Sequence, residues 1–355
     1  MRYLLLGGTG AIGSHLGSIL SRRGHDVTIT SRFNRNNVGK IKYLRGDAHD
    51  LNFIKETIKN GYDFIIDFMV YSLDEFNKDK VELFLDNAGT YVFLSSSRVY
   101  ANTGDKLITE ESPRLLDISK DKKFLATNEY SLAKAREENI LFNSAKKNWI
   151  ILRPYITFSE KRLQLGAYEA EAWIPRIMSG KPIVFSEDIS PMYTTMTYGE
   201  DVARIIAELT STTKFKGEIF NVCTSENMTW ESVLSVYIKK HEEIFGSRFD
   251  VKFVNVSLHT KLPASKYQVL YDRGYNRRFD NSKLLHCFRD FVFSPSKEKL
   301  ESCFEIYLKE YSNKQIVLPV RFEALQDKVC DTHTSLTSFP TVPRKLAYLL
   351  YRYIL

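Results

Sequence analysis

The chain has 355 residues, of which 43% are hydrophobic and 26% charged, enough apolar material to bury a large core and a smaller lobe. Its formal charge is +7, but basic residues are interspersed with acidic ones, so we expect anionic small ligands and no nucleic-acid partner. No secretory signal and no apolar run near the ~20 residues of a membrane span are found, which predicts a cytoplasmic protein. The cysteines lie far apart without metal-ligand spacing, which predicts free thiols and no metal site: Cys223, Cys287, Cys303 and Cys330.

A glycine-rich segment, residues 7–13 (GGTGAIG), follows an apolar run and precedes apolar residues at helical spacing. This order predicts a strand, a turn and a helix. Gly7 permits the tight turn, Gly10 lets the backbone approach a pyrophosphate, and Gly13 lets the helix pack closely on its strand. The segment therefore predicts a dinucleotide cofactor, with contacts from Gly7, Thr9, Gly10, Ala11, Ile12 and Gly13.

The second predicted strand, residues 25–30, ends without the carboxylate that binds the ribose hydroxyls of NAD. Ser31 and Arg32 stand there instead, and an arginine accommodates the phosphate of NADP. The predicted cofactor is thus NAD(P), with NADP favoured, while a solvated surface arginine is the alternative. Asp47 is placed to accept a hydrogen bond from the adenine amino group, unless it is a simple turn residue. The remaining predicted cofactor contacts are Ala48 and Phe68.

The residues that carry chemistry begin after a predicted buried strand at residues 91–94. Ser96 follows its carboxyl end, where ligands of open parallel sheets bind. Tyr130 and Lys134 are one turn apart in a segment of good helix formers, so they share a face. A neighbouring ammonium favours the phenolate form of a tyrosine, which can then remove an alcohol proton while a serine holds the oxygen. We predict Ser96, Tyr130 and Lys134 as catalytic residues, the last two also contacting cofactor; an ordinary surface pair is the alternative.

Taken in this order, the motifs resemble those of the extended short-chain dehydrogenases/reductases, the family of nucleotide-sugar epimerases, dehydratases and ketoreductases. The glycine turn and the Tyr130/Lys134 pair match the family's patterns, and Ser96 is selected because it stands four residues before Tyr100. The resemblance implies an α/β fold, a Rossmann-type doubly wound parallel sheet with a smaller C-terminal substrate lobe. It also implies a nucleotide-sugar substrate, and we expect a homodimer.

Departures from the family pattern bear on the substrate. Family dehydratases carry an Asp-Glu pair directly after the catalytic hydroxyl residue, where this chain has Ser97 and Arg98, so dehydration is not expected. An arginine that often binds the diphosphate is replaced by Thr194. Other arginines are the candidate replacements because guanidinium groups bind phosphates bidentately, and ordinary surface arginines are the alternative. The predicted substrate contacts are Ser97, Arg98, Arg162, Gln164, Arg273 and Arg278.

The expected organisation follows from the order of strands and helices. Residues 1–165 form the dinucleotide-binding domain, with residues 195–223 returning to it, and residues 166–194 and 224–312 form the substrate lobe. Residues 313–355 are expected to be a linker and a C-terminal amphipathic helix with basic residues beside its apolar side. That side either packs on its own domain or contacts a membrane surface or a second subunit.

Two enzymatic functions fit these observations. The first is a nucleotide-sugar epimerase that acts through a transient keto-sugar with tightly bound NAD(P), and the alternative is an NADPH-dependent nucleotide-sugar 4-ketoreductase. A third hypothesis is a non-catalytic dinucleotide-binding regulator or assembly protein. The intact Tyr130 and Lys134 pair argues against this third hypothesis.

Overall fold

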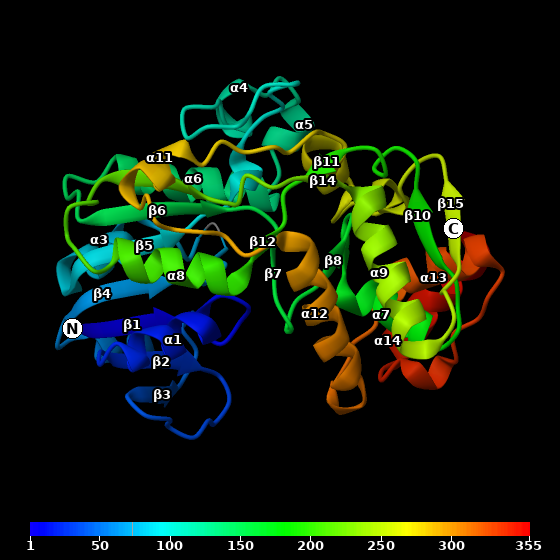
Figure 1. Ribbon diagram of the computed structural model, residues 1–355, viewed down its shortest axis with the longest axis horizontal. Coiled ribbons are helices and arrows are strands. Elements are labelled where there is room, and N and C mark those ends of the chain that lie inside the picture. Colours follow the sequence, from blue (N-terminus) through cyan, green and yellow to red (C-terminus); the bar gives the residue numbers. More distant parts are fainter. Residues whose placement is uncertain (73) are drawn as a thin grey trace. The chain divides into compact units, whose positions relative to one another are not determined.

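The computed structural model describes residues 1–72 and 74–355 (Figure 1). The chain forms two compact units. Unit 1 contains residues 1–159, 195–225 and 279–294, and unit 2 contains residues 160–194, 226–278 and 295–355. The grouping differs from the sequence-based boundaries in four places. Residues 224–225 and 279–294 belong to unit 1, and residues 160–165 and 313–355 belong to unit 2.

Unit 1 is built on a seven-stranded parallel sheet with the order β13-β6-β5-β4-β1-β2-β3. This is the predicted Rossmann-type, doubly wound α/β fold. The strand order reverses beside β1, and the crevice outside the carboxyl ends of the strands at such a point is where ligands of this fold bind. The strands are β1(Arg2–Leu6), β2(Asp26–Ser31), β3(Ile41–Arg45), β4(Tyr62–Asp67), β5(Ala88–Leu94), β6(Trp149–Pro154) and β13(Glu218–Val222).

Helices cover both faces of this sheet because the side chains of each strand alternate between its faces. In β1, Tyr3 and Leu5 pack with the apolar residues of α1(Gly13–Arg22), α8(Gly199–Leu209) and α11(Ser282–Cys287). Leu4 and Leu6 pack on the opposite face with α2(Leu51–Ile58), α3(Lys78–Asn87) and α6(Tyr130–Phe142). Both faces are therefore buried, as a parallel sheet requires. Outside the main sheet, β7(Thr157–Phe158) pairs with β12(Thr197–Tyr198).

Unit 2 combines short strands with five longer helices (Figure 1). β10(Ile183–Ser186) pairs with β15(Val251–Val254), and β8(Gln164–Leu165) forms a hairpin with β9(Tyr168–Glu169). A short antiparallel pair joins β11(Tyr193–Thr194) to β14(Met228–Thr229). The helices are α7(Ala170–Met178), α9(Trp230–Phe245), α12(Ser296–Lys309), α13(Val320–Cys330) and α14(Val342–Leu349).

Helix α13 lies within the segment expected to be a linker, and buried charges tie it to α7. The guanidinium of Arg176 on α7 donates to Glu323 at 2.9 Å and to Asp327 at 2.8 Å, and all three side chains are buried. Burial opposes ionisation of Asp327, but hydrogen bonds from Thr332, Thr334 and the Arg176 guanidinium outweigh it and hold the pKa of this carboxyl well below its usual range. The C-terminal segment is thereby part of the core of unit 2.

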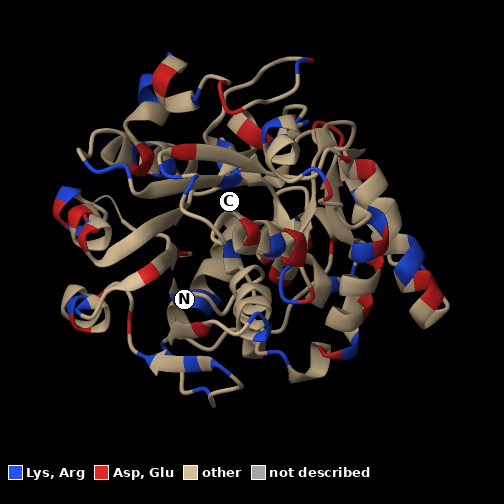
Figure 2. Cartoon of the chain, turned by 60° about the vertical axis from the view of Figure 1, so that its left-hand side comes forward, with Lys and Arg blue, Asp and Glu red and all other residues tan. Residues whose placement is uncertain are grey.

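The C-terminal helix α14 and the turn after it present apolar side chains to solvent. The exposed residues are Val342, Leu346, Leu350, Tyr353, Ile354 and Leu355. Within the described part of the chain, no helix combines the length and apolar character that crossing a bilayer requires. Basic and acidic residues are interspersed on the ribbon (Figure 2). The contact of this helix with a membrane surface or a second subunit stays a prediction.

A buried histidine in unit 2 gives a testable pH dependence of stability. His259 is 8% exposed, stacks on Phe322 with ring centres 4.4 Å apart, and has no hydrogen-bond partner for its ring nitrogens among the described residues. Burial, assisted by the charge of Arg273, lowers its pKa to about 3. The pKa of His259 in the folded protein lies below its value of about 6.5 in the unfolded chain. The neutral, buried histidine therefore makes its full contribution to the free energy of unfolding above about pH 6.5, and this contribution is lost as pH falls toward the folded pKa.

The substitution His259→Phe keeps the ring stack and removes this titration. Between about pH 7.5 and pH 5, the free energy of unfolding of the wild type should fall by about 2 kcal/mol more than that of His259→Phe. Urea unfolding at both pH values measures the difference. Equal pH dependence of the two proteins would contradict the buried neutral histidine.

Candidate active site

The glycine turn connects β1 to α1 in unit 1. Gly7 has a φ of 67°, which favours glycine, and a Cβ on Gly13 would lie 2.5 Å from the Gly8 backbone. A Cβ built on Gly10 would meet no atom of the described residues within 4 Å. Gly7 and Gly13 are therefore required by the turn and the helix packing, whereas Gly10 faces open space. A pyrophosphate at the N-terminus of α1 fits this arrangement.

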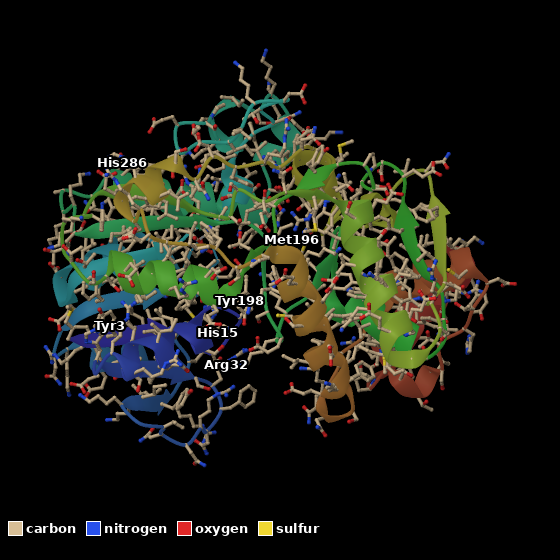
Figure 3. All side chains as sticks on the ribbon, in the orientation of Figure 1. Tyr3, His15, Arg32, Met196, Tyr198 and His286 are labelled. Carbon is tan, nitrogen blue, oxygen red and sulfur yellow. The ribbon has the colours of Figure 1, made fainter. Side chains whose placement is uncertain are left out.

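The predicted adenosine contacts lie at the carboxyl ends of β2 and β3. Ser31 ends β2, and its hydroxyl accepts a hydrogen bond from the amide of Phe33 at 3.2 Å. Arg32 follows and is exposed (Figure 3). The register of β3 places the exposed Arg45 opposite Ser31. Sequence analysis overlooked Arg45, because only strand pairing shows that it lies level with Ser31, the residue before Arg32. Asp47 is exposed and accepts from the amide of His49 at 3.0 Å.

The other predicted cofactor residues lie on or beside the same sheet. Ala48 is buried in the core on the α2 face of the sheet. The amide of Phe68, directly after β4, donates to the Leu6 carbonyl at 3.0 Å. Its side chain packs on the opposite core, the one that contains α1. Thr9, Ala11 and Ile12 lie within the glycine turn and are partly exposed.

Helix α6 begins at Tyr130 and carries the predicted tyrosine and lysine on one face. Glu129 caps this helix by accepting from the Ser131 amide at 2.7 Å, and it also forms an ion pair with Arg98. The Arg98 guanidinium lies over the Tyr130 ring, 5.2 Å from its centre. Among the described residues, the Tyr130 hydroxyl has no hydrogen-bond partner. Arg98 and Glu129 thus hold the ring, while its hydroxyl stays available for a substrate.

The ammonium of Lys134 is held below the surface. Its Nζ lies 2.9 Å from the Glu137 carboxylate, donates to the Met69 carbonyl at 3.2 Å, and lies 4.6 Å from the centre of the Phe93 ring. Lys134 is 1% exposed and Glu137 4% exposed. Burial raises the pKa of Glu137, although the charge of Lys134 opposes this shift. Sequence analysis overlooked Glu137, which lies one turn beyond Lys134.

Only one of the three serines after β5 keeps its hydroxyl proton uncommitted. Ser95 donates to Glu138 at 2.6 Å, and Ser97 donates to the Arg153 carbonyl at 2.7 Å. Ser96 accepts from the amide of Arg98 at 3.2 Å and so caps the short 3-10 helix η1(Ser97–Val99). Its own O–H has no acceptor among the described residues. Ser96 is therefore the serine whose hydroxyl proton is free to be donated, whereas Ser97 is buried in the core.

A buried network fixes the strand ends around these residues. The guanidinium of Arg153 on β6 bonds both carboxylate oxygens of Glu138, at 2.8 and 2.7 Å. Arg153 also donates to the Tyr100 hydroxyl at 2.8 Å, and this hydroxyl in turn donates to Asn221 on β13 at 2.7 Å. Burial raises the pKa of Tyr100 even though Arg153 opposes the shift. The network joins β6 and β13 to α6, and it thereby positions the helix that carries Tyr130 and Lys134.

A second buried carboxyl lies at the carboxyl end of β4. Asp67 accepts from Tyr71 at 2.9 Å, from Tyr91 at 2.6 Å and from the Met69 amide at 2.9 Å. Burial raises the pKa of Asp67, and the hydrogen bonds and the charge of Lys134 oppose this shift. Burial and the charge of Asp67 raise the pKa of both tyrosines well above the usual value. Tyr71 and Tyr91 therefore stay protonated donors to Asp67.

The remaining predicted substrate residues belong to unit 2. Arg162 forms a half-exposed ion pair with Glu169 at 2.8 Å, and Gln164 bonds the same carboxylate. Burial of Glu169 opposes its ionisation, but Arg162 outweighs burial and lowers its pKa. Arg273 is buried and donates to the Gly166 carbonyl at 3.0 Å. The guanidinium of Arg278 lies 5.5 Å from the centre of the Tyr193 ring. Their contact with a substrate stays a prediction.

One family model matches more than half of the chain. Residues 3–223 match the family described as "NAD dependent epimerase/dehydratase family". A curated relative, the chloroplast stem-loop binding protein of 41 kDa b from Arabidopsis thaliana, is 24% identical over 259 residues. That match covers 67% of this chain, and the chain spans only 62% of the length of this relative.

Solved structures share the fold at low sequence identity. The enzyme WbmH of Bordetella bronchiseptica, in complex with NAD+, has a TM-score of 0.68 at 15% identity, covering 87% of this chain and 99% of that chain. A UDP-glucuronic acid 4-epimerase from Bacillus cereus, in complex with NAD, has a TM-score of 0.62 at 18% identity, covering 88% and 99%. At these identities the likeness shows a common architecture.

Proposed function

Because this chain belongs to the NAD dependent epimerase/dehydratase family, we propose that it is a nucleotide-sugar epimerase that acts through a transient keto-sugar with bound NAD(P). The observation that carries the proposal is the pair of uncommitted hydroxyls, Ser96 and Tyr130, both next to Arg98, with Lys134 one helical turn beyond Tyr130. Fold neighbours named as complexes with UDP-glucuronic acid and NAD, or with NAD and UDP, support the substrate class.

The chemistry assigned to this chain's residues is acid–base work at a sugar hydroxyl. When bound, NAD(P) would be held at the glycine turn and would supply the hydride acceptor and donor for the sugar carbon. Tyr130, as phenolate, removes the hydroxyl proton and gives it back after the sugar has turned. Ser96 donates to the sugar oxygen and keeps it in line. Lys134 supplies the positive charge that favours the phenolate, and Arg98 restrains the Tyr130 ring.

A specific observation keeps the reductase alternative open. No carboxylate stands at the end of β2, where Ser31 and Arg32 lie with Arg45 opposite in the register. Two arginines at this edge favour the phosphate of NADP, and NADPH is the usual reductant of a ketoreductase. The curated relative's name suggests stem-loop binding instead, but the intact hydroxyl and lysine set argues for catalysis in this chain.

The substitution Arg32→Ala tests the cofactor preference. It should weaken NADP binding by about tenfold or more and leave NAD binding within about twofold, because only NADP carries the phosphate that the guanidinium would bind. Calorimetric titration with both cofactors measures the two dissociation constants. Equal losses for NAD and NADP would refute the phosphate contact, and Lys42→Ala on β3 is a control for a nearby exposed charge.

Turnover of UDP-sugars tests the proposed function itself. Purified protein is incubated with UDP-glucose, UDP-galactose or UDP-glucuronic acid, with product followed by NMR and reduced cofactor by absorbance. An epimer formed without net cofactor consumption supports the epimerase. Stoichiometric oxidation of NADPH with a keto-sugar would support the reductase, and no reaction in either assay would contradict both.

A further inference from the structure

We propose that Glu137 is a positioning residue for catalysis: its carboxylate is the counter-ion that holds the Lys134 ammonium in place and charged, one turn of α6 from Tyr130. Glu137 thereby sets the pH at which Tyr130 exchanges its proton. The kinetic part of this inference rests on the proposed function. Glu137 lies outside the Tyr-x-x-x-Lys pattern and contributes nothing to the chemistry assigned above.

The contacts of Lys134 leave Glu137 as its direct anionic partner. The Nζ atom is 2.9 Å from the Glu137 carboxylate, and its other neighbours are the Met69 carbonyl at 3.2 Å and the Phe93 ring at 4.6 Å. Lys134 is 1% exposed, so water cannot replace a lost partner. A buried ammonium without an anion is strongly disfavoured relative to the neutral amine. Glu137 therefore stabilises the charged form of the buried Lys134 side chain.

The other charged groups near this pair have hydrogen-bond, ion-pair or ring contacts of their own, although the charge of Asp67 also acts on both members of the pair. Asp67, on β4, accepts three hydrogen bonds, from Tyr71, Tyr91 and the Met69 amide. Glu138, the next residue of α6, is held by Arg153 and Arg114. Lys80 on α3 is buried, its ammonium lies over the Tyr71 ring, and its charge interacts with that of Asp67. Burial raises the pKa of Glu137 and Lys134 opposes the shift, so each partner favours the charged form of the other.

Removing the carboxylate of Glu137 should affect Lys134, one turn earlier in α6, and through it Tyr130. In Glu137→Gln the side chain keeps its size but loses its charge, so the amine of Lys134 is driven toward its neutral form. The phenolate of Tyr130 then loses electrostatic support and forms only at higher pH. Glu137→Asp keeps the charge on a shorter stem and should recover most of the effect. If Glu137 only packed against its neighbours, the substitution would change neither the titration of Lys134 nor that of Tyr130.

The experiment follows Tyr130 directly, without requiring turnover. Protein labelled with 13Cζ-tyrosine is titrated by NMR in the presence of NAD, and Tyr130→Phe identifies the resonance. In Glu137→Gln the titration midpoint of Tyr130 should rise by about one pH unit, with at least half of that shift reversed in Glu137→Asp. Glu56→Gln, which removes the exposed partner of Lys59 at the same i,i+3 spacing, should leave the midpoint unchanged. An unchanged or lowered midpoint in Glu137→Gln overturns the proposal.

Kinetics and a double variant complete the test. The rising limb of the epimerisation pH profile should move with the NMR midpoint, with a loss of about tenfold at neutral pH. If the wild type turns over no UDP-sugar, the proposed function fails while the NMR titration still decides the role of Glu137. If Glu137→Gln does not fold, Lys134→Met with Glu137→Gln should restore folding, because no unpaired charge remains. Failure of this double variant as well would mean that Glu137 only packs, and the proposal would fall.

Discussion

Tyr130→Phe should lower the rate of epimerisation by about a thousandfold while NAD binding stays within about threefold of the wild type. The substitution removes only the phenol oxygen, and the ring can keep its place under the Arg98 guanidinium. The loss should appear in kcat and kcat/KM together, since the hydroxyl acts on the reacting proton. Steady-state kinetics with a UDP-sugar and calorimetric titration with NAD measure both quantities.

Tyr62→Phe is the matched control for this experiment. Tyr62 begins β4 at the amino end of the strand, whereas the proposed catalytic Ser96 follows the carboxyl end of β5. Its activity should remain within about twofold of the wild type. Substantial activity in Tyr130→Phe would remove Tyr130 from the mechanism, whatever the control shows.

Glu138→Gln should cost unit 1 about 3–5 kcal/mol of unfolding free energy. Glu138 is fully buried and accepts both arms of the Arg153 guanidinium, a bond from Ser95 and another from Arg114. An amide in its place leaves the buried Arg153 charge without its anion. Urea unfolding at neutral pH measures the change.

Glu82→Gln provides the comparison for this stability measurement. Glu82 lies on α3 and is partly exposed, with Ser144 and Lys146 as its partners. Removing its charge should cost less than about 1 kcal/mol, as is usual for a surface ion pair. Losses of similar size in the two variants would contradict the assignment of Glu138 to a buried network.

Local patterns in the sequence predicted the fold and its family. A glycine turn between an apolar run and a helical pattern has one common structural solution, and the structure shows the parallel, doubly wound sheet that it indicates. Tyr130 and Lys134 share the face of one helix because their spacing is a property of the helix itself. Ser96 was selected by counting from Tyr100, and the hydrogen bonds of Ser95 and Ser97 now give an independent physical reason for that selection.

Local sequence patterns could not predict contacts between residues that lie far apart in the chain. Charged residues in a helix of good helix formers are usually solvated, yet Lys134, Glu137 and Glu138 are buried because Met69, Phe93 and Arg153 come from other elements. Only the register of β3 brings Arg45 level with Ser31, the residue before Arg32. Helix α13 was hidden for a similar reason: its Glu323 and Asp327 are charged side chains that Arg176, far away in the chain, holds in the core.

The fate of deuterium in a labelled substrate tests the central claim most directly. UDP-glucuronic acid deuterated on its sugar ring is incubated with the protein and NAD, and the product is examined by NMR. The account predicts an epimer that retains deuterium at the inverted carbon, without accumulation of reduced cofactor, because the same hydride leaves and returns. Release of deuterium to solvent at the inverted carbon would contradict the account, and so would a protein that binds NAD and UDP-sugar but never forms an epimer.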